Sequence, residues 1–168
     1  MSNSASPLPF EITHDHAHCI AQALDKAVHL CQQRGVRLTT LRRQVLELIW
    51  QNHKPVGAYT ILEQLHNPQG RRAAPPTVYR ALDFLLEQGL IHRIVSLNAF
   101  IGCWHPELPH FGQFLICEGC GNAAEFETPQ LNVDMQQQVN QLGFQVTKPT
   151  VELTGKCCYC QHKETNEF

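Results

Sequence analysis

The chain has 168 residues, of which 43% are hydrophobic and 17% charged, so it can build a packed core and does not resemble a disordered polyelectrolyte. Thirteen Lys and Arg against fifteen Asp and Glu give a formal net charge of −2. No run approaches the ~20 apolar residues of a membrane helix, and no secretory signal is visible at the start. We therefore expect a cytoplasmic protein without a membrane partner, whose cysteines are metal ligands or reactive thiols rather than disulfides.

The first half of the chain has the pattern of several short helices after a flexible start. Residues 1–13 are rich in Ser and Pro, and residues 1–15 are expected to be flexible. Apolar residues then recur at spacings of three and four, which predicts helices over residues 18–33 and 58–65. Between them, another helix is predicted to begin at Thr39 or Thr40, because either hydroxyl can cap it.

A turn at residues 54–57 precedes the third helix, and a fourth helix and a hairpin follow it. Pro76 suits the first position of the fourth helix, because its missing N–H leaves no hydrogen bond unmade there. Residues 90–95 and 99–103 are short apolar runs around a polar turn, which is typical of a β-hairpin. Helices followed by a hairpin are the order of a winged helix-turn-helix.

The second half alternates strands with one helix. Strands are predicted over residues 110–117, 123–127 and 144–153, and a helix over residues 129–142. The expected fold class is therefore α+β, with an N-terminal winged helix-turn-helix followed by a small α/β domain.

Six of the eight cysteines lie in the second half, where Cys117 with Cys120 and Cys157 with Cys160 form two CxxC pairs. This spacing lets two thiolates reach one tetrahedral ion at ~2.3 Å, and two such pairs fill a structural zinc site. Redox chemistry of a single CxxC and simple burial of apolar thiols are the alternatives, but two pairs in a cytosolic chain favour zinc. Cys158 is left over and is expected to be a free thiol.

The two halves also differ in charge. Residues 1–95 carry ten basic and seven acidic groups, whereas residues 96–168 carry three basic and eight acidic groups. This asymmetry is typical of a nucleic-acid-binding half joined to a non-binding half, although charge alone also fits an ordinary solvated surface. A recognition helix presents its first turns to base edges and phosphates. The candidate DNA contacts are Thr77, Tyr79 and Arg80 at the start of the fourth helix, with Arg71 and Arg72 before it.

The stretch PPTVYRALDFL at residues 75–85 resembles the recognition-helix signature of the ferric uptake regulator superfamily. The RLT stretch at residues 37–39, the LLEQG stretch at 85–89 and the two CxxC pairs agree with that family in order and spacing. Within the superfamily, the chain is most similar to the zinc uptake regulator branch. The resemblance implies that the winged helix binds DNA through Tyr59 and Arg80, and that metal licenses this binding.

The resemblance also implies a domain organisation and partners. A flexible N-terminus at residues 1–15 precedes a winged-helix DNA-binding domain at 16–95, a hinge at 96–109 and a zinc-binding dimerisation domain at 110–168. The expected partners are a second copy of the chain and double-stranded operator DNA. Neither a small organic substrate nor enzymatic activity is expected.

A second metal site follows from the same resemblance, which matches His92, Cys103, His110 and Glu125 to the sensing site of the zinc regulators. Two imidazoles, a thiolate and a carboxylate suit Zn²⁺, so two zinc ions per chain are expected. His105 lies in the same segment as His110 and competes with it for this role. His110 is preferred because it keeps the family's spacing to Cys117.

The expected function is that of a zinc-responsive transcriptional repressor of zinc-uptake genes. His92 and Cys103 belong to the wing and hinge, whereas His110 and Glu125 belong to the distal domain, so an ion held by all four fixes one domain against the other. Zinc and DNA then favour the same conformation, and each raises the affinity for the other. The histidines at residues 14–18 form a further candidate cluster, although flexible His tracts bind metal weakly.

Two other functions fit parts of the sequence. An iron or peroxide sensor of the same superfamily is the close rival, and Cys103 argues against it because the iron sensors use only nitrogen and oxygen ligands. A zinc-dependent deaminase is the remote rival, since His105-Pro106-Glu107 with Cys117 and Cys120 superficially matches its motif. No proline precedes Cys117, and the second CxxC pair would leave no position for an activated water.

Overall fold

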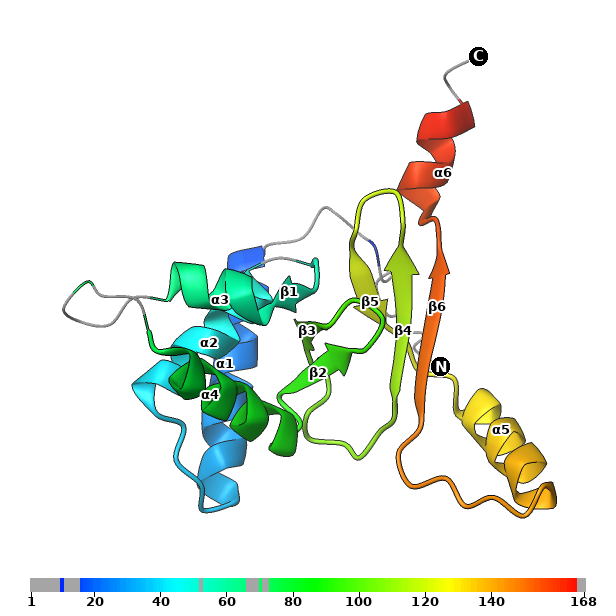
Figure 1. Ribbon diagram of the computed structural model, residues 1–168, viewed down its shortest axis with the longest axis horizontal. Helices are drawn as coiled ribbons and strands as arrows, with labels where there is room; N and C mark the ends of the chain where they lie inside the picture. The colour runs from blue at the N-terminus through cyan, green and yellow to red at the C-terminus, as the bar shows by residue number, and fades with distance from the viewer. Residues whose placement is uncertain (1–9, 11–15, 52, 66–69, 71–72, 166–168) are drawn as a thin grey trace, which may run out of the picture.

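The computed structural model describes residues 10, 16–51, 53–65, 70 and 73–165, which form a helical N-terminal half and a sheet-based C-terminal half (Figure 1). The elements of the first half are α1 His16–Gln33, α2 Thr40–Trp50, β1 Val56–Gly57, α3 Ala58–Gln64, α4 Pro75–Glu87, β2 Ile91–Ile94 and β3 Ala99–Gly102. Those of the second half are β4 Gly112–Cys117, β5 Ala123–Glu125, α5 Pro129–Gln141, β6 Thr150–Gly155 and α6 Cys158–Thr165.

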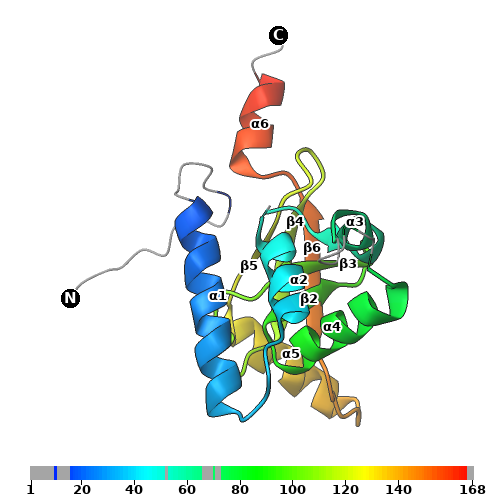
Figure 2. The same ribbon diagram turned by 90° about the vertical axis from the view of Figure 1, so that its left-hand side faces the viewer.

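The helices of the first half form where the apolar spacing predicts them. The side chain of Thr39 accepts a hydrogen bond from the Arg42 backbone N–H and caps α2, which confirms one of the two predicted caps. Figure 2 shows α1 and α2 side by side, with α4 beyond α2. Their inward faces make one core, whose least exposed members are Ala27, Val45, Ile49, Ile61, Val78, Leu82 and Leu85.

Two local predictions in this half are wrong. Residues 56 and 57, predicted as part of a turn, form the short strand β1, which pairs antiparallel with β3. The pairing partner lies more than forty residues away, so local turn signals do not reveal it. Helix α4 begins at Pro75 with Ala74 as its N-cap, which moves Pro76 to the second helical position. Both prolines are tolerated there because the first turn of a helix needs no N–H donors.

The wing is the antiparallel hairpin of β2 and β3, joined by residues 95–98. Opposite residues of such a ladder share a face, so His92 and Ile94 lie on one face with Ile101, and Ile91 lies on the other with Phe100. The second face belongs to the helical core. Because β3 pairs with β2, the segment that links the two sheets runs over residues 103–111, later than the expected hinge at 96–109.

The C-terminal half is built on a three-stranded sheet in the order β5-β4-β6. Strands β4 and β6 are parallel, with Cys117 opposite Gly155 in the register. A parallel pair requires a crossover, and β5, α5 and the chain after α5 supply it. The predicted strand over residues 144–153 is present only from Thr150 onwards, and helix α6, which was not predicted, follows β6.

Helix α5 forms as predicted but buries none of its residues within the chain. Its neighbourhood also exposes large apolar side chains, with Leu142 83% and Phe144 65% exposed. By contrast, the wing and the C-terminal sheet share a small buried cluster of Ile94, Ile101, Phe114, Ile116 and Ala123. Apolar packing therefore joins the two halves of one chain and leaves α5 uncovered.

Within the described residues, no helix combines the length and apolar character needed to cross a membrane.

Candidate metal centres and nucleic-acid interface

The four-cysteine centre, formed by Cys117, Cys120, Cys157 and Cys160, lies where two parallel strands end. Cys117 is the last residue of β4 and Cys120 follows in the next turn, whereas Cys157 follows β6 and Cys160 lies on α6. The carboxyl ends of adjacent parallel strands meet at one edge of the sheet, so 36 intervening residues do not separate the two pairs in space. The four Sγ atoms lie within 4.8 Å of one another.

The geometry of this centre fits a tetrahedral ion. The Sγ atoms of Cys120 and Cys157 are 3.9 Å apart, close to the ~3.8 Å edge of a tetrahedron with ~2.3 Å bonds. The Cys157 backbone N–H donates to the Cys117 Sγ atom at 3.3 Å. Burial raises the pKa of Cys117, but hydrogen bonds from the backbone of Cys157 and Cys120 outweigh it and lower this pKa to about 6. Cys117 is therefore prepared to act as a thiolate.

Two glycines make this approach possible. A Cβ atom on Gly119 would lie 2.8 Å from the Sγ atom of Cys160, so only a glycine admits that thiol. Gly121 has a φ of +74°, a conformation that favours glycine. Cys158 is exposed on the first turn of α6 and is not part of the cluster.

The interdomain centre, formed by His92, Cys103, His110 and Glu125, joins the two halves of the chain. His92 lies on β2 and Cys103 directly after β3, whereas His110 precedes β4 and Glu125 ends β5. Their four ligand atoms lie within 4.8 Å of one another. The Nε2 atoms of His92 and His110 are 2.9 Å and 2.7 Å from Glu125 Oε1, and 3.1 Å from each other. The Cys103 Sγ atom is 3.4 Å from the same His110 nitrogen.

The hydrogen bonds of this centre direct lone pairs into its middle. His110 Nδ1 lies 2.7 Å from the Leu108 carbonyl oxygen, which can only accept, so in the neutral imidazole Nδ1 carries the proton and Nε2 is bare. Glu125 Oε1 is buried and makes no well-oriented hydrogen bond, although two imidazole nitrogens lie close to it. A cation between these atoms would satisfy all of them, which is the arrangement that a metal site presents.

The charges of the centre are coupled. Burial raises the pKa of Glu125, but the close approach of the His92 imidazole and the positive charges that His92 and His110 can carry lower it overall, so Glu125 is a carboxylate. Burial, followed by the Glu125 charge, raises the pKa of Cys103 far above its ordinary value. Without a cation, the centre therefore holds one carboxylate and one protonated thiol.

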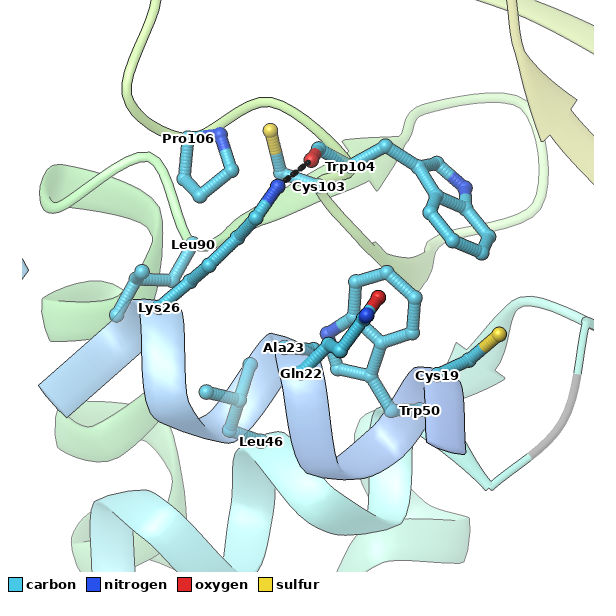
Figure 3. Close-up of a pocket in the computed structure, with 10 residues that line it drawn as sticks. All are labelled: Cys19, Gln22, Ala23, Lys26, Leu46, Trp50, Leu90, Cys103, Trp104 and Pro106. Carbon is cyan, nitrogen blue, oxygen red and sulfur yellow. Dashed lines mark hydrogen bonds between the residues drawn. The ribbon is translucent and has the colours of Figure 1, made fainter. Parts of the chain in front are cut away.

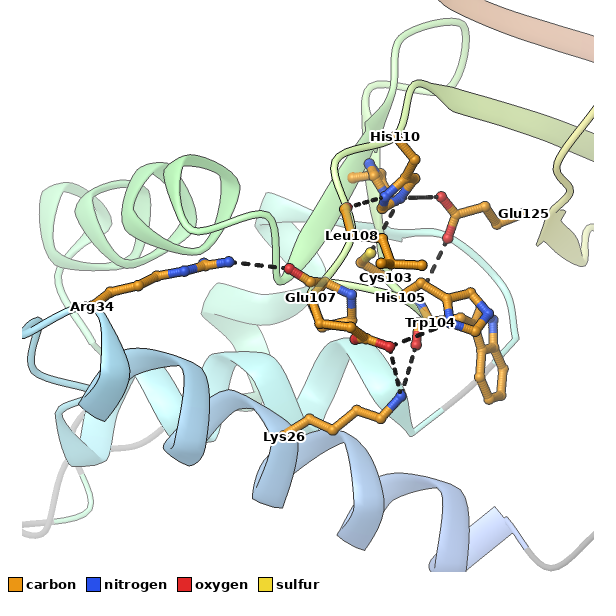
Figure 4. A network of polar contacts seen from close by, with 11 residues as sticks. Lys26, Arg34, Cys103, Trp104, His105, Glu107, Leu108, His110 and Glu125 are labelled. Carbon is orange, nitrogen blue, oxygen red and sulfur yellow. Dashed lines mark hydrogen bonds and ion pairs between the residues drawn. The ribbon is translucent and has the colours of Figure 1, made fainter. Parts of the chain in front are cut away.

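Helix α1 and the residue that follows it hold the linker, residues 103–111, which carries two of these candidate ligands. Lys26 Nζ donates to the Trp104 carbonyl at 3.1 Å across a pocket of about 30 Å³ that Cys103 also lines (Figure 3). The same ammonium group is 3.6 Å from the Glu107 carboxylate (Figure 4). Arg34 donates to the Pro106 carbonyl at 3.1 Å. Sequence reasoning missed Lys26 and Arg34, because their contacts span more than seventy residues and follow no motif.

His105 and Glu107 lie outside both centres. The His105 side chain is 54% exposed and its Nδ1 is 3.5 Å from the Glu107 carboxylate (Figure 4). The structure thus brings His110, not His105, into the interdomain cluster. It also separates the His105-Pro106-Glu107 stretch from the four-cysteine centre, so the deaminase-like site is not assembled.

The candidate DNA contacts lie on the outer surface of α3 and α4. Val78, Ala81, Leu82 and Leu85 anchor α4 in the core, whereas Thr77, Tyr79 and Arg80 are exposed. Tyr59 on α3 is 78% exposed. Arg71, Arg72 and residues 14 and 15 of the histidine cluster lie outside the described residues.

Comparison with known proteins adds to this picture. The sequence model of the ferric uptake regulator family matches residues 33–154. The zinc uptake regulation protein of Escherichia coli (strain K12) is 36% identical over 144 residues, which cover 85% of this chain and 84% of that protein.

Three solved structures of similar proteins were compared with this chain. A zinc uptake regulator complexed with zinc and DNA has a TM-score of 0.81 at 35% identity, covering 87% of this chain and 97% of that chain. Holo XcZur has a TM-score of 0.77 at 39% identity, covering 84% and 98%. Apo XcZur has a TM-score of only 0.50 at 40% identity, covering 84% and 97%. The chain belongs to the ferric uptake regulator family, whose members are transcriptional regulators rather than enzymes.

Proposed function

We propose that this chain is a zinc-responsive transcriptional repressor in which zinc at the interdomain centre favours the form that binds operator DNA. The observation that carries the proposal is the position of the four ligands. His92 and Cys103 come from the wing side, whereas His110 and Glu125 come from the C-terminal side. Residues from both halves can share one ion only in one relative orientation.

The donor set favours zinc over iron. Cys103 supplies a thiolate beside two imidazoles and a carboxylate, and this mixture suits the borderline-soft Zn²⁺ ion. The four-cysteine centre would hold a second zinc ion that ties α6 and the end of β6 to β4. The resemblance to the zinc uptake regulation protein supports the same choice of metal.

The relative orientation of the halves supports a link between metal and DNA binding. The chain resembles apo and holo XcZur almost equally in sequence, but resembles the holo form far better in shape, with TM-scores of 0.50 and 0.77. The regulator complexed with zinc and DNA is closer still. We infer that the arrangement described above is the DNA-binding one.

A symmetric dimer completes the proposal. We propose that the part up to β3 reads DNA and that the part from β4 onwards pairs two copies. The uncovered helix α5 and the exposed Leu142 and Phe144 supply an apolar face for a second copy. Two recognition helices read successive half-sites only at one separation. Thr77, Tyr79, Arg80 and Tyr59 are the proposed contacts, with Arg71 and Arg72 beside them.

The test is DNA binding as a function of metal. A DNA duplex would first be selected from a random library with the zinc-loaded protein, and its affinity then measured with zinc, with ferrous iron and without metal. A coupling of ~1–3 kcal/mol predicts that zinc strengthens binding ~5–150-fold. Equal or stronger activation by ferrous iron would overturn the assignment to zinc.

Elemental analysis provides the control. The wild-type protein is expected to hold two zinc ions per chain and the Cys103→Ser variant one. The variant should stay a folded dimer and lose the response of DNA binding to zinc. Normal zinc-dependent binding by Cys103→Ser would contradict the role of the interdomain centre.

A further inference from the structure

The tip of the wing is attached to the C-terminal sheet by one carboxylate. The backbone N–H groups of Val95 and Ser96 donate to Glu152 Oε1 and Oε2, at 2.6 Å and 3.1 Å. Val95 and Ser96 begin the turn between β2 and β3, and Glu152 lies on β6 opposite Phe114 of β4. The contact thus joins residues that are 56 and 57 positions apart and lie in different halves of the chain.

This contact is suited to hold the wing in place. Two neighbouring N–H groups of a turn form a small concave donor site, and a carboxylate that uses both oxygens fixes the distance and the direction of the turn. Burial raises the pKa of Glu152, but the hydrogen bonds from Ser96 and Val95 lower it overall, so the group is an anion at neutral pH.

The contact lies at the opposite end of the wing from the interdomain centre. His92 and Val95 are three residues apart, which is ~10 Å along a strand. Between these two points, Ile94 and Ile101 pack on Phe114 and Ile116. A single attachment at the metal centre would leave the wing free to rock about it, whereas a second attachment ~10 Å away removes this rotation.

We propose that Glu152 is a positioning residue for DNA binding, which secures the wing turn and so sets the orientation of the DNA-reading half on the dimerisation half. The inference rests on the proposed function, because orientation matters only if a dimer must present two recognition helices at a fixed separation. Glu152 contacts no metal ligand in the structure, and its effect acts through the backbone of the wing.

The variants Glu152→Gln and Glu152→Ala test this role in the full-length, zinc-loaded protein. Gln keeps one acceptor oxygen and removes the charge, whereas Ala removes both oxygens. Glu127→Gln is the matched control, because it removes one charge from the same half at an exposed position outside α5. The probe is the duplex selected with the wild-type protein, at saturating zinc.

The expected result combines two measurements. Hydrogen exchange of the peptide that spans residues 95–98 should speed up in both Glu152 variants and stay unchanged in Glu127→Gln. The Kd for the duplex should rise about 5- to 20-fold in Glu152→Ala and less in Glu152→Gln, with two zinc ions still bound. A contact that only stabilises the fold would lower Tm and leave the Kd at saturating zinc unchanged.

Three outcomes would overturn the inference. The first is unchanged exchange in residues 95–98, and the second is an unchanged Kd despite faster exchange. The third is tighter DNA binding than the Glu127→Gln control, which would make the contact inhibitory. The proposed function fails separately, if wild-type binding to the duplex does not depend on zinc. The exchange comparison still tests the wing contact in that case.

Discussion

At the scale of single residues, Cys103 is the proposed zinc ligand whose protonation state must change on metal binding. Its side chain is 3% exposed and faces the Glu125 carboxylate, and both factors raise its pKa, so the thiol is protonated at neutral pH. Glu125 is already ionised because its pKa is lowered. A thiol must lose its proton to become a zinc ligand, so the proton that leaves on zinc binding comes from Cys103 and not from Glu125.

Zinc binding at the interdomain centre is therefore expected to release about one proton from Cys103. Because the pKa of this thiol lies above the working pH, the zinc affinity should rise about tenfold per pH unit between pH 6.5 and 8, as far as Cys103 controls it. Titration calorimetry in buffers of different ionisation enthalpy measures the released protons. A heat that does not depend on the buffer would contradict this account of the site.

Gly119 must be a glycine because of its position in the four-cysteine centre. A methyl group there would meet the Cys160 Sγ atom at 2.8 Å, so Gly119→Ala is expected to push Cys160 away and to weaken the four-cysteine centre. Gly155→Ala is the matched control, because a Cβ on Gly155 meets nothing within 4 Å and its φ is not positive. Loss of zinc to a chelating dye should speed up in the first variant alone. Equal zinc retention in both variants would show that Cys160 can move aside.

At the scale of elements, the sequence predicts those helices and strands whose formation depends on local pattern. The apolar spacing of 3.6 residues marks α1, α2 and α4, and the Thr39 cap marks the start of α2. By contrast, β1 depends on its partner β3, and β6 depends on its parallel pairing with β4. Residues 144–149 have the alternation of a strand, but they pair with no strand in the described part of the chain and so do not form one. Helix α6 has no apolar face that periodicity could detect.

Helix α4 presents Arg80 on its exposed face. Its buried face fixes the helix, so Arg80 projects from the outer face without a structural role in the core. Arg80→Ala is expected to flatten the sequence preference at one position of each half-site, by ~1–3 kcal/mol. Arg80→Lys keeps the charge but loses the planar fork, so it should restore the phosphate attraction and not the preference. Binding to a panel of single-base duplex variants measures this effect, and an unchanged preference in Arg80→Ala would remove Arg80 from base reading.

At the scale of the whole molecule, the two clusters of candidate metal ligands were predictable from the sequence and the contacts between the halves were not. Residue type and spacing, together with the family resemblance, name all eight side chains that the structure gathers into two clusters. The attachments of the linker to Lys26 and Arg34, and of the wing turn to Glu152, bind backbone groups. Backbone donors and acceptors are present at every position, so no residue pattern marks those that will be used.

The four-cysteine centre is expected to be required for folding of the C-terminal half and for pairing of two copies. It brings the end of β4 beside α6, where none of residues 158–162 is buried, so a metal ion there would replace a core. Cys117→Ser is expected to unfold this edge of the sheet and to abolish the dimer, because structural zinc contributes ~10–16 kcal/mol to such units. Cys158→Ser removes an exposed thiol next to Cys157 and should change neither the zinc content nor the dimer. Sedimentation velocity and elemental analysis on both variants measure the dimer and the zinc content. A stable, zinc-poor dimer of Cys117→Ser would show that pairing does not need this ion.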